Sequence, residues 1–406
     1  MKKEIKTNRF FYATVRFLSS IASQLFFANR KKRNEIKGKK GPFVVLANHA
    51  AALDFTNLIT ATREPMSFVI SKSFFQMLPA RFIVDRLGLI PKQQFQTALE
   101  DLRKMKHTVD GGGILVIYPA GLMCEDGVST PIPVATYKFL QWIGADIYVA
   151  RSEGTYFCTP KWATGRKRRR GRTYIDIYKL FDKEELASMD VEEVRDKANA
   201  ALLFDAYREQ EELKIKYRGA SDIRGLENVL YTCPHCQSDY TMRVRKKKYI
   251  YCTECGYEEV CDSYGFLHKT SEVGEEIRHV SDWNRLIHDK ERRNIEECGG
   301  EIPVRARVQT ADTKKKKYID AGECTVTLCE KRFTLSGRLH GEEVNIEIST
   351  ASFASLPFSP SRYFEIQDGD RIYRCIPNDP RVVTKFINRV KIFYEMHNHL
   401  ETAVAE

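Results

Sequence analysis

The sequence predicts an α/β domain with a mostly parallel sheet and helices on both faces, followed by a small cysteine-containing segment and a β-rich module closed by a helix. Between residues 42 and about 180, short apolar runs alternate with helix-like segments, as in parallel α/β sheets. Two C-x-x-C pairs lie within residues 231–267. Alternating strand-like runs then fill residues 301–376, and a final amphipathic helix is expected at about 381–397.

The N-terminal segment, residues 1–40, combines positive charge with an apolar helix. It holds twelve Lys/Arg against Glu4 and Glu35, in a chain of formal net charge +11. Within residues 9–28 two stripes recur at helical spacing, an apolar one and a polar one: Phe11, Val15, Leu18, Ala22 and Leu25; Arg9, Arg16, Ser20 and Ser23. Because Arg16 interrupts the apolar run, we expect a basic amphipathic helix lying on an anionic membrane surface rather than a spanning helix. The alternative is a helix packed on its own domain.

The α/β domain is expected over residues 41–225. Its strands are predicted from short apolar runs, at 43–47, 67–70, 114–118 and 146–150. Its helices are predicted from helical periodicity, at 54–62, 72–87, 94–109, 133–143 and 190–214. Parallel sheets of this kind place ligands at the carboxyl ends of their strands.

Cysteine usage and charge indicate the compartment. The two C-x-x-C pairs suit reduced thiols, and Arg30–Arg33 follows the N-terminal apolar run where a signal peptide would have small residues. We therefore expect a cytoplasmic protein, peripheral on the inner face of the cell membrane. Two more basic clusters, Arg166–Arg172 and Lys314–Lys317, are expected either to attract phosphate-bearing surfaces or to be solvated faces.

His49 and Asp54 are the candidate catalytic pair. The first strand runs directly into Asn48 and His49, and a strand end displays a reacting group well. Histidine suits general base work near neutral pH, and a carboxylate on its second ring nitrogen stabilises the imidazolium. We expect His49 in the loop and Asp54 in the first helical turn. The alternative is a core histidine beside a helix-capping aspartate.

Two further motifs follow this pair. Residues 88–92 read GLIPK, which places Lys92 after a short apolar run. Residues 111–121 read GGGILVIYPAG, a strand that leads into a Tyr-Pro-Ala-Gly turn.

These motifs, in this order, resemble the glycerolipid acyltransferases typified by 1-acylglycerol-3-phosphate acyltransferase. The likeness covers roughly residues 10–180. Asn48, His49 and Asp54 match the family's Asn-His-x4-Asp block, and Lys92 stands where a phosphate-binding cation is expected. The third block, Phe-Pro-Glu-Gly in the family, is Tyr118-Pro119-Ala120-Gly121 here.

The resemblance implies an O-acyltransferase of phospholipid biosynthesis. His49 would take the proton of an acceptor hydroxyl, oriented by Asp54, while the oxygen attacks an acyl thioester. The donor would be acyl-CoA or acyl carrier protein, and the acceptor a lysophospholipid or related lipid. The substrate-binding residues would be Asn48, Lys92 and Gly121. Glu125 would replace the glutamate that the family has at the position of Ala120.

Cys233, Cys236, Cys252 and Cys255 predict a structural zinc ribbon over residues 226–270. Thiolates at x2 spacing chelate one tetrahedral zinc, and four of them leave no open position for catalysis. Redox pairs or an iron site are the alternatives. Five cations, from Arg243 to Lys248, lie on the expected hairpin. Because aromatic residues and cations do not alternate there as in a recognisable RNA-binding sheet, nucleic acid is not expected as a partner.

The C-terminal part is expected as a helical connector at 271–300 and a β-rich module at 301–406. Its strands closed by one helix resemble a pleckstrin-homology domain in architecture alone. A small β module used for packing or oligomerisation is the alternative. For the whole chain, an acyltransferase-like scaffold without catalysis and a nucleic-acid-binding ribbon protein remain as competing functions.

Overall fold

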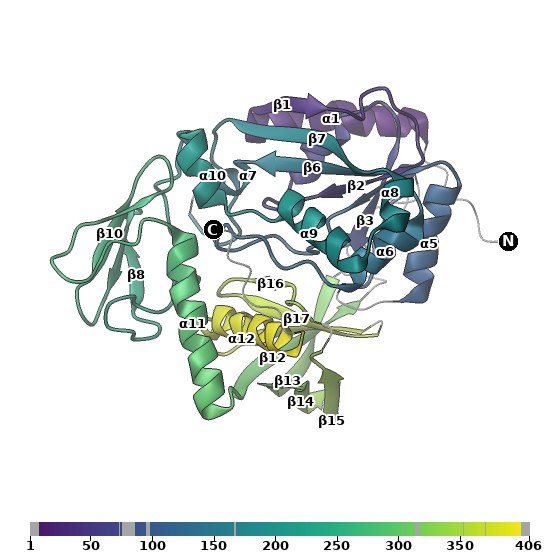
Figure 1. Cartoon of the computed structure of the whole chain (residues 1–406). Helices are drawn as coiled ribbons and strands as arrows, with labels where there is room; N and C mark the ends of the chain where they lie inside the picture. Colours follow the sequence, from purple (N-terminus) through teal and green to yellow (C-terminus); the bar gives the residue numbers. More distant parts are fainter. Residues whose placement is uncertain are drawn as a thin grey trace. The chain divides into compact units, whose positions relative to one another are not determined.

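The computed structural model describes residues 8–72, 74, 86–94, 98–165, 168–312, 317–351, 353–369 and 371–398. The helix predicted at 72–87 lies mostly outside these residues, as do parts of the basic segments at 1–40, 166–172 and 314–317. Two compact units divide the chain (Figure 1). Unit 1 is Met1–Cys124, Val128–Thr159 and Arg168–Arg218; unit 2 is Glu125–Gly127, Pro160–Lys167 and Gly219–Glu406.

Unit 1 is built on one seven-stranded sheet in the order β1-β7-β6-β2-β5-β3-β4 (Figure 1). Its strands are β1 (Asn29–Asn34), β2 (Phe43–Ala47), β3 (Met66–Ser71), β4 (Ile90–Lys92), β5 (Ile114–Ile117), β6 (Ile147–Glu153) and β7 (Thr173–Phe181). The pair β6–β7 is antiparallel and the other neighbouring pairs are parallel. The α/β fold class is therefore confirmed, with a mixed sheet that gains β1, β4 and β7 beyond the strands predicted from the sequence.

Helices cover both faces of this sheet. They are α1 (Arg9–Phe27), α2 (Asp54–Ile59), α5 (Leu99–Asp110), α6 (Ala135–Ile143), α7 (Thr155–Cys158), α8 (Lys183–Ser188), α9 (Val191–Leu202) and α10 (Ala206–Leu213). One core joins Val44 and Leu46 of β2 to α5, α6 and α9. A second core joins Phe43 and Val45 of the same strand to α1 and α2. β2 is apolar throughout because both of its faces are buried.

The helix predicted at 190–214 is in fact two helices, α9 and α10. A capping box opens α9, with Asp190 and Glu193 each accepting from the other's backbone N–H. Leu203 then turns extended, with φ −70° and ψ 144°. Tertiary contacts explain this break, because the N–H of Phe204 donates to Ser129 Oγ, at 3.1 Å.

Helix α1 confirms the predicted amphipathic helix, and it buries a mixed face of aromatic and serine side chains against the protein. Tyr12, Ser19, Ser23 and Phe27 are buried, and Ser23 Oγ donates to Asn57 Oδ1 of α2 at 2.8 Å. Ser23 of the polar stripe is therefore on the inner side of the helix. The outer face carries exposed apolar side chains at positions Phe10, Phe17, Leu18, Ile21 and Leu25.

Among the described residues, no helix is both long enough and apolar enough to cross a membrane.

Unit 2 begins with a four-stranded antiparallel sheet in the order β11-β10-β9-β8. Its elements are η1 (Leu226–Asn228), β8 (Met242–Arg245), β9 (Tyr249–Cys252), β10 (Glu258–Cys261) and β11 (Leu267–Lys269). Helix α11 (Val280–Cys298) follows, so the helix expected from residue 271 starts later. Trp283 of α11 is fully buried, and its indole N–H donates to Thr232 O at 3.0 Å.

The C-terminal module of unit 2 is a seven-stranded antiparallel sheet in the order β15-β14-β13-β12-β18-β17-β16, with one helix after it. Its elements are β12 (Ile302–Asp312), β13 (Lys317–Cys329), β14 (Arg332–Leu339), β15 (Glu342–Ser349), β16 (Phe358–Ser359), β17 (Tyr363–Asp368), β18 (Arg371–Pro377) and α12 (Val382–His397). Phe386 of α12 stacks on Phe364 of β17 at 4.3 Å between ring centroids, which places α12 over the sheet. The β-rich module closed by a helix is therefore present, and its likeness to a pleckstrin-homology domain stays a prediction.

Candidate active site and metal site

The His49–Asp54 pair forms where β2 leads into α2. His49 lies in the loop after β2, and Asp54 is the first residue of α2, as predicted. His49 Nδ1 and Asp54 Oδ2 are 3.3 Å apart. The side chain of Asp54 is 1% exposed and that of His49 is 24% exposed, so the carboxylate is buried and the imidazole reaches solvent.

The loop backbone fixes the Asp54 carboxylate. Asp54 Oδ2 accepts the backbone N–H groups of Ala50 and Ala51, each at 2.8 Å. These two hydrogen bonds hold the carboxylate against the imidazole. Asp54 Oδ1 is buried and has no hydrogen-bond partner within the described part of the chain. Such an orphaned oxygen normally costs about 1–3 kcal/mol, and active sites are where such costs are commonly found.

Tyr118 is a site residue that sequence reasoning did not single out. It follows β5, the neighbour of β2, and its ring lies 4.7 Å from the His49 ring, centroid to centroid. Burial, reinforced by the Asp54 charge, holds the pKa of the Tyr118 hydroxyl well above its usual range. The phenol is therefore neutral and shields one side of the imidazole. A tyrosine directly after a strand whose neighbour ends at His49 was the signal that could have identified it.

Asn48 lies at the same sheet edge, but its side-chain amide is hydrogen-bonded to backbone atoms. Its Nδ2 donates to Ser152 O at 2.8 Å, and its Oδ1 accepts from Ser152 N at 2.7 Å. These two bonds join the ends of β2 and β6 and thereby fix the strand end that carries His49. The substrate-binding role of Asn48 stays a prediction.

A glutamine two residues after Lys92 links this segment to Gly121. Lys92 ends β4, and the residue two positions on, Gln94, donates from Nε2 to the Gly121 carbonyl at 2.6 Å. Burial lowers the pKa of the Lys92 ammonium, and the charge of Asp101 partly offsets this effect. Lys92 Nζ donates to Gln93 O at 3.1 Å, its one hydrogen bond among the described residues. An ammonium carries three donors, so two remain for a ligand.

Glu125, the remaining predicted substrate-binding residue, belongs to unit 2. It is 1% exposed and forms an ion pair with Lys391 of α12. Its carboxylate is therefore already neutralised inside the protein. A role in acceptor binding stays an untested prediction.

A pocket adjoins His49 within unit 1. Two segments that the sequence did not mark, 129–132 and 202–204, contribute to it. The lining is mostly carbon and consists of Ala47, Asn48, His49, Pro119, Ala120, Ser129, Thr130, Ile132, Leu202, Leu203 and Phe204. Ala120, which stands in place of the family's glutamate, therefore faces this pocket.

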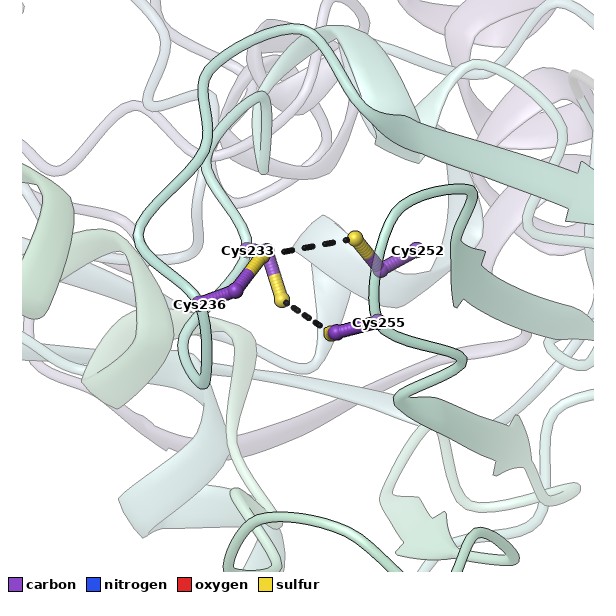
Figure 2. A group of neighbouring side chains, drawn as sticks. All are labelled: Cys233, Cys236, Cys252 and Cys255. Atoms are coloured by element: carbon purple, nitrogen blue, oxygen red, sulfur yellow. Dashed lines mark hydrogen bonds between the residues drawn. The ribbon is translucent and has the colours of Figure 1, made fainter.

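The four predicted metal ligands come together in unit 2 (Figure 2). Their sulfur atoms lie within 4.8 Å of one another, with Cys233–Cys255 at 3.6 Å and Cys236–Cys252 at 3.7 Å. A tetrahedral zinc with Zn–S bonds of about 2.3 Å sets its sulfurs about 3.8 Å apart, so the site fits this ion. The Glu254 N–H also donates to Cys252 Sγ at 3.4 Å, an outer contact typical of thiolate ligands. The four cysteines could therefore hold a metal ion.

Comparison with known proteins supports the assignment of unit 1. Residues 13–157 match the family model described as Acyltransferase. This match includes His49, Asp54, Lys92 and Tyr118. Residues 13–157 are therefore similar to the Acyltransferase family.

Other comparisons gave weaker likenesses. No curated protein matches the chain. The crystal structure of the 1-acyl-sn-glycerophosphate (LPA) acyltransferase PlsC from Thermotoga maritima is 17% identical, covers 50% of this chain and 79% of its own, and has a TM-score of 0.41. The Ran binding domain of the nuclear complex component Nup2 from Ashbya gossypii is 16% identical, covers 24% of this chain and 97% of its own, and has a TM-score of 0.20. Neither structural likeness is close enough to support an argument.

Proposed function

We propose that this protein is an O-acyltransferase that moves an acyl group from acyl-CoA or acyl carrier protein to a hydroxyl of a lysophospholipid or related lipid, in phospholipid biosynthesis. The observation that carries the proposal is the His49–Asp54 pair at the carboxyl edge of the sheet. It lies beside a carbon-lined pocket, within the segment that matches the acyltransferase family model.

The geometry supports a direct transfer. Because Nδ1 of His49 faces Asp54, Nε2 is left to accept the proton of the acceptor hydroxyl. As that oxygen bonds to the thioester carbonyl carbon, the C–S bond breaks and the leaving thiolate takes the proton from Nε2. Asp54 stabilises the imidazolium between these two transfers. Tyr118 lies beside the ring, with the two ring planes tilted by 44°.

The acceptor would contact one charged side chain, Lys92, and several apolar side chains. Lys92 offers two donors to a phosphate, whose charge would offset the burial that lowers the lysine pKa. The wall next to His49 is formed by Ala120, Ile132 and Leu202 instead of a carboxylate. An acceptor with an apolar group beside its reacting hydroxyl therefore fits this wall better than one with several free hydroxyls.

The outer face of α1 supports work at a membrane surface. Phe10 is 84% exposed and Phe17 is 64% exposed, and both belong to one apolar face of the helix. Arg168 lies at the C-terminal end of this helix, where its guanidinium donates to Leu25 O at 3.0 Å. An apolar helix face with a cation near its end suits anionic headgroups and the acyl chains below them.

We further propose that the four cysteines hold a structural zinc. Four thiolates complete its coordination, so this ion supplies folding energy to a small sheet and takes no part in acyl transfer.

An acyl-transfer assay with a mixed acceptor pool tests the proposed function. The purified protein is offered lysophospholipids, glycerol phosphate and other hydroxylated lipids with each donor, and all products are read by mass spectrometry. We expect acylated lipid from at least one acceptor, and a shift toward more polar acceptors in Ala120→Glu. No product with either donor would favour the alternative, a lipid-binding scaffold that lost its acceptor site at Ala120.

A further inference from the structure

The outer face of the β8–β9 hairpin in unit 2 brings together cations of one strand and tyrosines of the next. Arg243 and Arg245 are the exposed residues of β8, and Met242 lies on its buried side. Strand register places Arg243 opposite Tyr251 and Arg245 opposite Tyr249. Directly opposed residues share one face of an antiparallel pair, so these four side chains form two Arg–Tyr rows on one surface.

The rings and the cations of this surface are in contact. The Arg245 guanidinium lies 5.1 Å from the Tyr249 centroid and 5.9 Å from the Tyr251 centroid. Lys248 Nζ lies 5.2 Å from the Tyr249 centroid. Both tyrosines are only partly buried, so their rings are accessible from the same side as the charges. This is the arrangement in which a cation and an aromatic face attract each other.

The turn between the two strands adds three more cations. Lys246 and Lys247 both adopt left-handed backbone, with φ of 47° and 68°. Glycine or asparagine usually occupies such positions, because a Cβ is strained there. Lys246, Lys247 and Lys248 are exposed, and in the described part of the chain none of them forms a salt bridge with a carboxylate. Folding alone gives no reason for lysines at these two strained positions, which points to use of their charge.

Glu258 is the carboxylate on the neighbouring strand that faces the same side. Its Oε2 accepts from Arg245 Nε at 2.5 Å, and its Oε1 accepts from Thr270 at 3.0 Å. The bond from Arg245 lowers the pKa of Glu258, so Glu258 is ionised and offsets one arginine. Arg243 keeps its position through its bonds to the carbonyls of Tyr240 and Met242. Glu227 also lies within electrostatic reach of Arg243, so the three lysines remain as the net positive charge of this face.

We propose that this Arg–Tyr face, formed by Arg243, Arg245, Lys246–Lys248, Tyr249 and Tyr251, binds single-stranded nucleic acid. Its cations would contact phosphates, and its two tyrosines would stack on unpaired bases, the combination typical of single-strand binding. Tyr249 and Tyr251 are about 7 Å apart along one strand, because side chains two residues apart repeat at twice the rise of 3.4 Å. That spacing suits consecutive bases rather than a single nucleotide. The turn carries no exposed aliphatic side chain, which disfavours insertion into a membrane.

Binding is measured on the full-length, zinc-loaded protein by fluorescence anisotropy with a short labelled oligouridylate. Parallel arms use a duplex of equal length, free coenzyme A as competitor, and anionic phosphatidylserine vesicles. We expect the single strand to bind more tightly than the duplex, with an affinity that falls as salt rises.

Two sets of variants separate charge from stacking. The combined change Lys246→Gln, Lys247→Gln, Lys248→Gln should reduce the slope of log affinity against log salt by roughly 0.7 for each phosphate that is no longer neutralised. Tyr249→Leu and Tyr251→Leu should each weaken binding roughly tenfold, whereas Tyr→Phe at the same positions should keep it. Arg305→Gln, Arg307→Gln, Arg338→Gln on the C-terminal sheet is the matched control of equal charge change. Zinc content and thermal unfolding confirm that each variant is folded.

Several results would overturn this inference. Binding that is equal for single strand and duplex, or unchanged in the leucine variants, would remove the role of the tyrosines. Binding confined to vesicles would assign the charges to a membrane. Coenzyme A that binds without any oligonucleotide binding would assign the face to a single nucleotide.

Discussion

Asp54 shows how a few local bonds hold a carboxylate against a histidine ring. One of its oxygens accepts two backbone N–H groups and faces His49 Nδ1, so the carboxylate cannot turn away from the ring. The sequence predicted this pair from its place after a strand, together with the later motifs that resemble the acyltransferase family. It was not sufficient to predict that Asn48 bonds Ser152, because that contact depends on β2 and β6 being neighbours.

Glu259 provides a pH-dependent test at the residue scale. It is fully buried on β10, and its Oε1 accepts from the Tyr257 hydroxyl and the Ile277 N–H, at 2.6 and 2.7 Å. Its Oε2 has no partner among the described residues, which suits a protonated carboxyl. Burial raises the pKa of Glu259 from 4.5 to about 7.

The free energy of unfolding should therefore fall as pH rises through this window. The unfolded chain releases the Glu259 proton near pH 4.5, whereas the folded chain holds it to about pH 7. About 3 kcal/mol of the free energy of unfolding is therefore lost between these two pH values. Glu259→Gln should abolish that loss and be more stable than the parent above pH 7. Chemical denaturation across the range measures it, with the adjacent Glu258→Gln as control. A parent and a Glu259→Gln variant with parallel profiles would contradict the assignment.

Helix α1 shows what periodicity can and cannot decide at the element scale. Spacing predicted a helix over residues 9–28, and α1 is Arg9–Phe27. It did not decide which stripe faces the protein, because Asn57 of α2 offers a buried partner to Ser23. Similarly, β7 was missed because its buried and half-buried residues alternate instead of forming one apolar run.

Removing apolar side chains from α1 should weaken membrane binding. Phe17→Ser, Leu18→Ser and Ile21→Ser are exposed changes that leave the buried face intact. Because each side chain contributes apolar area to the interface, we expect at least about a tenfold loss of binding to anionic vesicles in co-sedimentation. Leu99→Ser and Leu286→Ser, also exposed, are the matched controls and should bind as the parent does. Equal sedimentation of all variants would exclude α1 as the membrane contact.

Removal of metal should unfold the sheet that carries the four cysteines. The proposed ion would join the loops that hold Cys233–Cys236 and Cys252–Cys255. We expect one bound zinc per chain, and a chelator should increase hydrogen exchange over residues 231–267 before unit 1 responds. Metal analysis and exchange mass spectrometry measure the two effects. A metal-free protein with unchanged exchange would contradict the site.

At the scale of the whole molecule, the sequence predicted fold class better than connectivity. Buried runs such as β2 and β5 identified the sheet, and the cysteine spacing identified the metal-ligand set. Long-range arrangements were not predictable from one sequence. Residues Glu125–Gly127 pack in unit 2 although unit 1 flanks them on both sides. The hairpin of β8 and β9 was expected from the sequence, but the register that forms the Arg–Tyr rows was not.

The most direct test of the account is the rate of acyl transfer by His49→Ala, with Asp54→Asn beside it. If His49 takes the acceptor proton, His49→Ala should lose at least about a hundredfold in kcat, as expected for a general base. Asp54→Asn should also lose activity, because the imidazolium loses its partner. Both variants should retain vesicle binding and the parent melting temperature. A His49→Ala protein that transfers acyl groups at the parent rate would contradict the proposed mechanism.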